Sequence, residues 1–218
     1  MFSLDAGVSY GQGALPAAHH KVGYAMNSKS KLERLKAYHE AGHAVMARTL
    51  GMAMSYVTML PTDDMTAGSA MADSASWLAR NADQATQLAA IEKDMKALLA
   101  GPHAQARYQP RKTKRIPSEW ASDFKLAKSC ATKAVLIRNG RGADVPIGEG
   151  TFEIALGADD LVEIDRLFNR VSNETEALVA KLWPAITLVA EELLTRRSLF
   201  EDEVDALIRE VTDGRRDR

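Results

Sequence analysis

The segment His39-Glu40-Ala41-Gly42-His43 places two imidazoles four residues apart. On a helix, both histidines project from the same face one turn apart, so both can reach one metal ion, and Glu40 points beside that ion. This pattern is typical of zinc hydrolases, in which the ion lowers the pKa of a water toward ~7. It predicts Zn²⁺ ligands at His39 and His43, and it predicts Glu40 as general base and then general acid in amide-bond hydrolysis. A chance match on a polar helix face is the alternative.

The flanking residues predict the helix that would carry this motif. Ser30 and Glu33 have the spacing of a capping box, which would begin the helix, and Gly51 stands where a left-handed cap would end it. We therefore expect a helix from residue 31 up to Gly51, with the motif in its middle.

Length and composition predict one domain that folds alone. The chain has 218 residues, 46% of them hydrophobic, which is enough to bury a core. Residues 1–29 are rich in glycine, lack apolar periodicity and do not resemble a signal peptide, so we expect a flexible tail there, with Met26 as a second candidate start. The domain is expected over residues 30–212, followed by a short tail at 213–218.

Charge and cysteine usage narrow the class of protein. The 28 basic and 29 acidic residues give a net charge of −1, which argues against a nucleic-acid partner, and we interpret the basic run at 111–115 as a solvated loop. No apolar stretch approaches the ~18 residues that a membrane span needs. Cys130 is the single cysteine. It excludes an intramolecular disulfide and a cysteine-based zinc site, and it favours a reducing, cytoplasmic location.

The remaining patterns predict a mostly helical α+β fold with a small β-hairpin beside the zinc helix. Residues 55–60 and 66–72 are the expected strands, and an extended substrate can add to the edge of such a hairpin, although a purely structural hairpin is equally compatible with the sequence. Helical periodicity returns over residues 83–99, where Gly101-Pro102 is expected to end the helix.

Two further helices are expected towards the C-terminus. One opens at 119–124 and ends at Asn139-Gly140. The next begins at Asp159, and Pro184 either kinks it or starts a second helix. Between them, residues 138–157 are expected to form a glycine-rich mobile loop without the Gly-Lys-Ser/Thr ending of a phosphate-binding loop. Ser198 is a candidate cap for a short final helix.

The motif and its downstream segments resemble the peptidase domain of the FtsH family of ATP-dependent zinc metalloproteases. Residues 37–45 match that family's zinc helix almost letter for letter, and residues 57–61 resemble its following strand. Residues 100–106 are a weakened form of its glycine-led Gly-Gly-Arg-Ala-Ala-Glu segment, in which Gln105 and Arg107 replace the acidic end.

The resemblance also supplies a third ligand. Ala121-Ser122-Asp123-Phe124 is similar to the family's Ala-x-Asn-Asp-Leu, which implies that Asp123 binds the zinc. Without the family, Asp123 is a carboxylate stabilised by the dipole at a helix start. Glu119 and His103 are the other candidates for a third ligand, although a lone histidine near a helix end is usually structural.

The resemblance implies a zinc-dependent metalloendopeptidase that cleaves unfolded or extended protein substrates. The chain carries no Walker-type phosphate loop, so we expect a stand-alone peptidase domain with a separate ATPase partner or a homo-oligomer as possible assemblies. The alternatives are a non-catalytic interaction module working with an ATPase and a dedicated regulatory protease with one protein target. An intact Glu40 argues against the interaction module.

Overall fold

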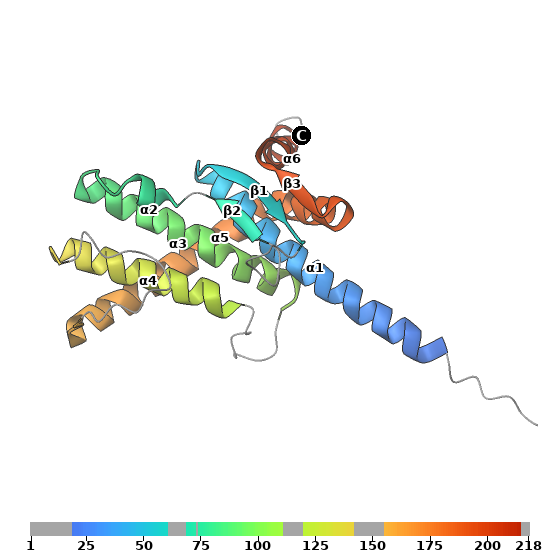
Figure 1. Ribbon diagram of the computed structural model, residues 1–218, viewed down its shortest axis with the longest axis horizontal. Coiled ribbons are helices and arrows are strands. Elements are labelled where there is room, and N and C mark those ends of the chain that lie inside the picture. Colours follow the sequence, from blue (N-terminus) through green and yellow to red (C-terminus); the bar gives the residue numbers. More distant parts are fainter. Residues whose placement is uncertain (1–18, 61–68, 73, 111–119, 142–154, 215–218) are drawn as a thin grey trace, which may run out of the picture. The chain divides into compact units, whose positions relative to one another are not determined.

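The helix predicted to carry the His39–His43 motif is present as α1, His19–Thr49, in the computed structural model (Figure 1). The structure describes residues 19–60, 69–72, 74–110, 120–141 and 155–214. The helix begins before Ser30, so the predicted start is wrong; the capping-box spacing permits a start but does not impose one. Residues 19–29 of the expected tail are thus helical, and residues 1–18 lie outside the described residues. By its contacts the chain divides at Leu32, and every side chain discussed below belongs to the second unit, residues 33–218.

The end of α1 confirms the prediction made from Gly51. This glycine has a φ of +71°, its N–H donates to the carbonyl of Arg48 at 3.1 Å, and the N–H of Met52 donates to the carbonyl of Ala47 at 2.9 Å. These two bonds form a Schellman motif, which needs a left-handed residue at this position.

A three-stranded antiparallel sheet follows α1. The predicted hairpin is present as β1, Met54–Thr58, paired with β2, Ser69–Ala72. A third strand, β3, Ser198–Phe200, pairs with the other side of β1 and gives the order β2-β1-β3. Ser198 lies in this strand with its Oγ 2.6 Å from the Oγ1 of Thr58, so its predicted capping role is wrong.

The final helix is capped by another residue. In α6, Glu201–Asp213, the side chain of Glu203 accepts a hydrogen bond from the N–H of Phe200 at 2.8 Å. The short α2, Ala75–Leu78, was not predicted.

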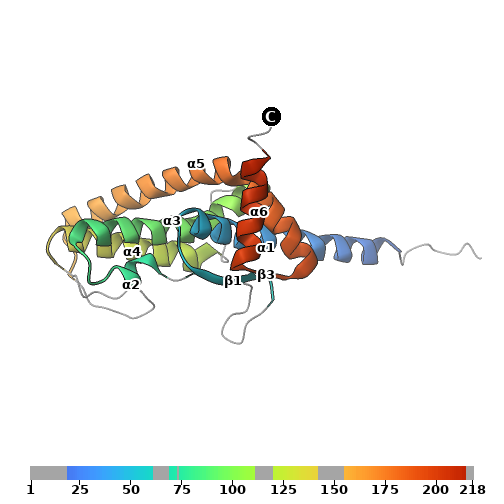
Figure 2. The ribbon, with the colours of Figure 1, turned by 90° about the horizontal axis from the view of Figure 1, so that it is seen from above.

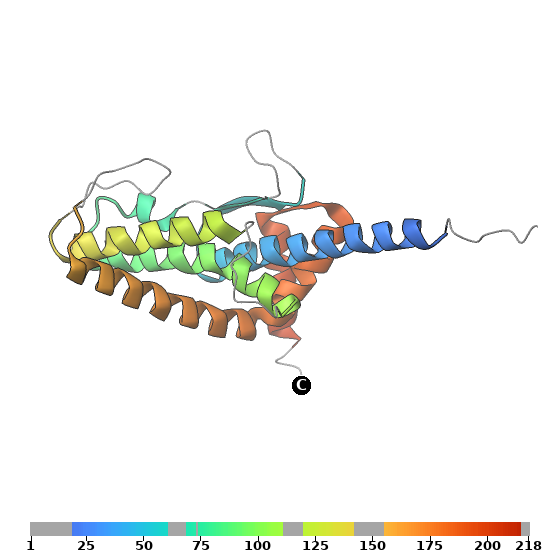
Figure 3. The ribbon, with the colours of Figure 1, turned by 90° about the horizontal axis from the view of Figure 1, so that it is seen from below.

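The helix α3, Gln84–Tyr108, begins where the sequence predicts, with the Asp83 carboxylate accepting from the N–H of Thr86 at 3.0 Å. It does not end at Gly101-Pro102, so that prediction is wrong. Pro102 has no N–H for the carbonyl of Leu98, and a proline inside a helix can bend it without ending it. Figure 3 shows the last turns of α3 directed away from its first part.

Two longer helices complete the fold. α4 covers Ala121–Arg138 and ends as predicted, with Gly140 at a φ of +69°. α5 is one helix, Ala158–Arg196, with Pro184 inside it, and it bends (Figures 2 and 3); of the two predicted alternatives, a kinked single helix is confirmed and a second helix beginning at Pro184 is not present. The basic run at 111–115, Glu119 and most of the glycine-rich segment lie outside the described residues.

Two groups of buried side chains hold these elements together, and α3 belongs to both. Its Ala100 and Ala104 pack with α1, β1, β3, α6 and the second half of α5. Its Ile91, Met95 and Leu99 pack with α4 and the first half of α5, and the three helices lie side by side in Figures 1 and 3. The architecture confirms a mostly helical α+β fold. None of the described helices combines the length and apolarity needed to cross a membrane.

Candidate metal centre

Glycines allow α1 and α3 to approach closely beside the motif. A Cβ on Gly42 would lie 2.6 Å from the carbonyl oxygen of Ala100, and a Cβ on Gly101 would lie 2.3 Å from the Nε2 of His43. Real Cβ atoms do not approach other atoms so closely. The two glycines therefore bring the backbones together and leave space for the His43 ring against α3.

The backbone of α3 fixes the tautomer of His43. Its Nδ1 lies 2.8 Å from the carbonyl oxygen of Ala97. A carbonyl oxygen only accepts hydrogen bonds, so Nδ1 carries the hydrogen. In the neutral ring, the Nε2 of His43 is therefore left with a lone pair for a metal.

His39 is oriented by a side chain instead. Its Nδ1 lies 3.0 Å from the Oε1 of Gln105, and the same Oε1 accepts a hydrogen bond from the Nε1 of Trp120 at 2.7 Å. Because an amide oxygen only accepts, the Nδ1 of His39 is the donor. Its Nε2 is then also free to bind a metal.

Three atoms with lone pairs converge at one point. The Nε2 of His39 lies 3.0 Å from the Nε2 of His43 and 3.2 Å from the Oδ2 of Asp123, which lies in the first turn of α4. The Asp123 Oδ2 is 3.8 Å from the Nε2 of His43; it is buried, and no described residue hydrogen-bonds to it. When both rings are neutral, these lone pairs repel one another, and either a metal ion between the three atoms or a proton on the Nε2 of His39 relieves the repulsion.

These contacts test whether the residues fit a metal ion. The ligand atoms of His39, His43 and Asp123 all lie within 4.8 Å of one another, and their side chains are 12 to 15% exposed. Both Nδ1 atoms already donate to protein groups, and the Asp123 Oδ2 lacks a donor. The three residues predicted as ligands therefore form a group that can hold a metal ion.

Burial and neighbouring charge set the protonation of the site. Burial lowers the pKa of His39, but the Asp123 carboxylate, the charge of Glu40 and the bond to Gln105 outweigh it and raise that pKa. The pKa of His43 is lowered by burial and then by the charge of His39. Relative to a free imidazole, His39 therefore holds a proton more readily and His43 less readily.

Glu40 is buried beside this group. Burial, opposed by the charge of His39 and assisted by that of Asp123, raises the pKa of Glu40 to about 7. A carboxylate with such a pKa can both accept and release a proton near neutral pH.

His103, another candidate ligand, is not part of the group. The Nε2 of His103 lies 3.0 Å from the Oγ of Ser172, and burial lowers the pKa of this histidine. Glu119 lies outside the described residues. Cys130 is buried in the α3–α4–α5 core, where burial raises the pKa of its thiol to about 12.

The sequence interpretation missed the roles of Gln105 and Trp120. Gln105 was noticed only as a departure from the family's glycine-led segment. The expected helix end at Gly101-Pro102 hid the fact that residues 101 and 105 lie one turn apart on the same face of α3, towards α1.

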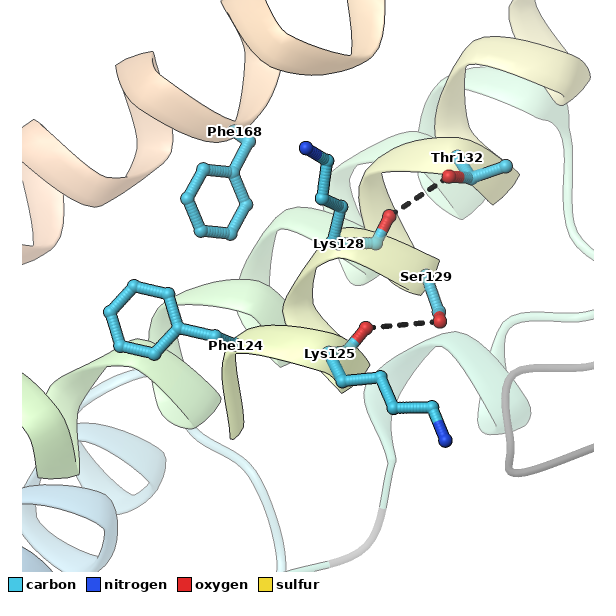
Figure 4. A pocket seen from close by; sticks show the side chains of 6 residues that line it. All are labelled: Phe124, Lys125, Lys128, Ser129, Thr132 and Phe168. Carbon is cyan, nitrogen blue, oxygen red and sulfur yellow. Dashed lines mark hydrogen bonds between the residues drawn. The ribbon is translucent and has the colours of Figure 1, made fainter. Parts of the chain in front are cut away.

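A shallow groove lies on α4 next to the site. Phe124 follows Asp123 in the chain and faces Phe168 of α5, with ring centroids 5.9 Å apart; the groove has a volume of about 490 Å³ and is also lined by Lys125, Lys128, Ser129 and Thr132 (Figure 4). Both hydroxyls of this groove donate to backbone carbonyls of α4. Lys128 pairs with Asp165 at 2.8 Å.

A scan against protein-family models and a search of curated proteins found no match to this chain. The resemblance to the FtsH peptidase domain therefore rests on the motifs described above.

Proposed function

We propose that this chain is a zinc-dependent metalloendopeptidase of the FtsH type that cleaves unfolded or extended polypeptides. The observation that carries the proposal is the convergence of the Nε2 atoms of His39 and His43 with the Oδ2 of Asp123. These atoms come from three turns of two helices that are distant in sequence. A polar helix face that matched the motif by chance would not need a buried carboxylate opposite both imidazoles.

The donor set favours zinc. Two imidazoles and one carboxylate are the ligands of many catalytic zinc sites, which keep one position open. When bound, Zn²⁺ supplies positive charge that polarises a substrate carbonyl and makes water a better nucleophile. With two neutral imidazoles and one carboxylate, the occupied site has a net charge of about +1, so part of the ion's charge remains for this task.

Glu40 carries the proton transfers in this proposal. Its carboxylate takes a proton from the attacking water as the new bond to the carbonyl carbon forms. It then gives that proton to the peptide nitrogen as the carbon–nitrogen bond breaks, so the products are a carboxylic acid and an amine, which then exchange the remaining proton to become a carboxylate and an ammonium ion. The pKa of about 7 belongs to Glu40 without an ion; the positive charge of a bound Zn²⁺ would favour the ionised carboxylate, which is the form that accepts the proton from water.

Two considerations support the proposed substrate class: the outer edge of β2 and the free energy needed to unfold a folded substrate. Within the described residues, β2 pairs only with β1, so its outer edge is a place where an extended peptide can add as a strand. Folded domains are held by ~5–15 kcal/mol, so their cleavage needs separate unfolding work. A separate ATPase partner would supply that unfolding work, either with one copy of this chain or with several copies assembled around it.

The test uses one substrate protein in a folded form and a permanently unfolded form. We expect zinc-loaded wild type to cleave the unfolded form, and we expect Glu40→Gln to lose at least ~10²-fold in rate while retaining its fold. Stimulation by ATP is not expected from the chain alone. If wild type cleaves neither form, or if Glu40→Gln turns over like wild type, the proposal is wrong, and the former outcome favours an interaction module.

A further inference from the structure

The orientation of Gln105 decides which nitrogen of His39 is available to a metal. A glutamine amide presents an acceptor oxygen on one side and a donor NH₂ group on the other. A neutral imidazole can satisfy either side by changing tautomer. The amide alone therefore does not determine whether Nε2 of His39 carries a lone pair or a hydrogen.

Trp120 removes this ambiguity. Its indole Nε1–H can only donate, and it lies 2.7 Å from the same Oε1 that faces the Nδ1 of His39. Trp120 is 8% exposed and Gln105 is 4% exposed, so water cannot easily replace either bond. If the amide were reversed, its NH₂ group would face the indole N–H, and two donors would meet in a buried place.

We propose that Trp120 is a positioning residue: its indole N–H holds the Gln105 amide so that His39 keeps the tautomer with Nε2 free for a metal ion. This role has a purpose only if the proposed metal site exists. The hydrogen bonds among Trp120, Gln105 and His39, however, are present without any ion.

The position of Trp120 in the fold supports this role. It stands at the N-cap position of α4, and Asp123 lies in the first turn of the same helix. The ring is stacked on Phe124 at 6.3 Å between centroids, and Phe124 contacts Phe168 of α5. One helix start thus delivers both a ligand carboxylate and the donor that orients a ligand histidine.

His43 has no need of such a device. Its Nδ1 donates to the carbonyl oxygen of Ala97, a group that has no donor side to present. A glutamate at position 105 would also be an acceptor only. The importance of the indole N–H should therefore depend on the residue at position 105.

This dependence defines the experiment. Four proteins are compared: wild type, Trp120→Phe, Gln105→Glu and the double variant Trp120→Phe/Gln105→Glu. The first readout is the Zn²⁺ dissociation constant, measured by competition with a chelator. The second is the ¹⁵N NMR spectrum of the His39 ring in the metal-free protein at a pH where the ring is neutral, which reports the tautomer directly.

We expect Trp120→Phe to weaken Zn²⁺ binding by about 10- to 100-fold, the usual effect of removing a group that supports a ligand. His39 should then show a mixture of tautomers. The double variant should bind Zn²⁺ as tightly as Gln105→Glu alone, because a carboxylate needs no indole to orient it. Trp183→Phe, which removes an indole that stacks on Tyr38 at 5.3 Å, serves as the control and should keep the His39 tautomer.

Two results would overturn the inference. An equal loss of affinity from Trp120→Phe in both backgrounds would mean that the residue acts only by packing. An unchanged single tautomer of His39 in Trp120→Phe would mean that the amide is held without it. Because the NMR readout uses metal-free protein, it tests the inference even if wild type binds no zinc and the proposed function fails.

Discussion

Gly101 of α3 leaves the space that the imidazole of His43 occupies: a Cβ at residue 101 would lie 2.3 Å from the Nε2 of that ring. The same ring is anchored at its other nitrogen to the carbonyl of Ala97, on the turn of α3 before Gly101. The position of one candidate ligand on α1 is therefore set by the backbone of a different helix.

This relationship predicts that Gly101→Ala damages the proposed metal site more than the fold. The added methyl group must displace the His43 ring, so we expect Zn²⁺ affinity to fall by at least about tenfold. Alanine is favoured over glycine inside a helix by about 1 kcal/mol, so α3 itself should not be weakened. Chelator competition measures the affinity, and thermal unfolding of the metal-free protein measures the stability.

Gly42→Ala is the matched variant. Its Cβ would meet backbone, the carbonyl oxygen of Ala100 at 2.6 Å, which cannot rotate away as a side chain can. We therefore expect this variant to lose thermal stability because α1 and α3 must separate. If Gly101→Ala binds zinc like wild type, the ring of His43 is not held where the structure places it.

The burial of His103 leads us to predict that the free energy of unfolding depends on pH. Burial lowers its pKa below the ordinary value of 6.5, so below that pH the unfolded chain binds a proton at this position more readily than the folded chain. The free energy of unfolding should fall as the pH falls from about 6.5 towards the pKa of the folded protein. Urea unfolding midpoints of metal-free protein at about pH 7.5 and about pH 5 measure the effect.

His103→Gln separates this residue from the other titrating groups. Glutamine retains an amide that can reach Ser172 but does not titrate, so the variant should lose less stability than wild type between the two pH values. Equal losses in both proteins would show that His103 does not have the lowered pKa described here.

The features that were predictable from sequence depend on neighbouring residues. The left-handed glycines at residues 51 and 140 end α1 and α4 because a Schellman motif needs only a few adjacent residues. The spacing of His39 and His43 likewise fixes their common face through helix geometry alone. Asp123 was reached through a family resemblance, because no local rule connects it with residues 39 and 43.

The features that were missed depend on contacts between distant parts of the chain. Gly101-Pro102 signals a helix end locally, but the buried surroundings of α3 on the α1 side favour continued helix with a bend. β3 has three residues and exists because it pairs with β1, far earlier in the sequence. The bond between Trp120 and Gln105 joins two helices, so no periodicity reveals it.

The most direct test of the central claim is the zinc content of purified wild type and three variants. We expect about one zinc per chain in wild type and in Glu40→Gln, because Glu40 is not a ligand in this account. His43→Ala and Asp123→Ala should each lose the metal, because each removes one of the three converging atoms. Full zinc in Asp123→Ala would contradict the site proposed here, as would wild-type protein that takes up no zinc.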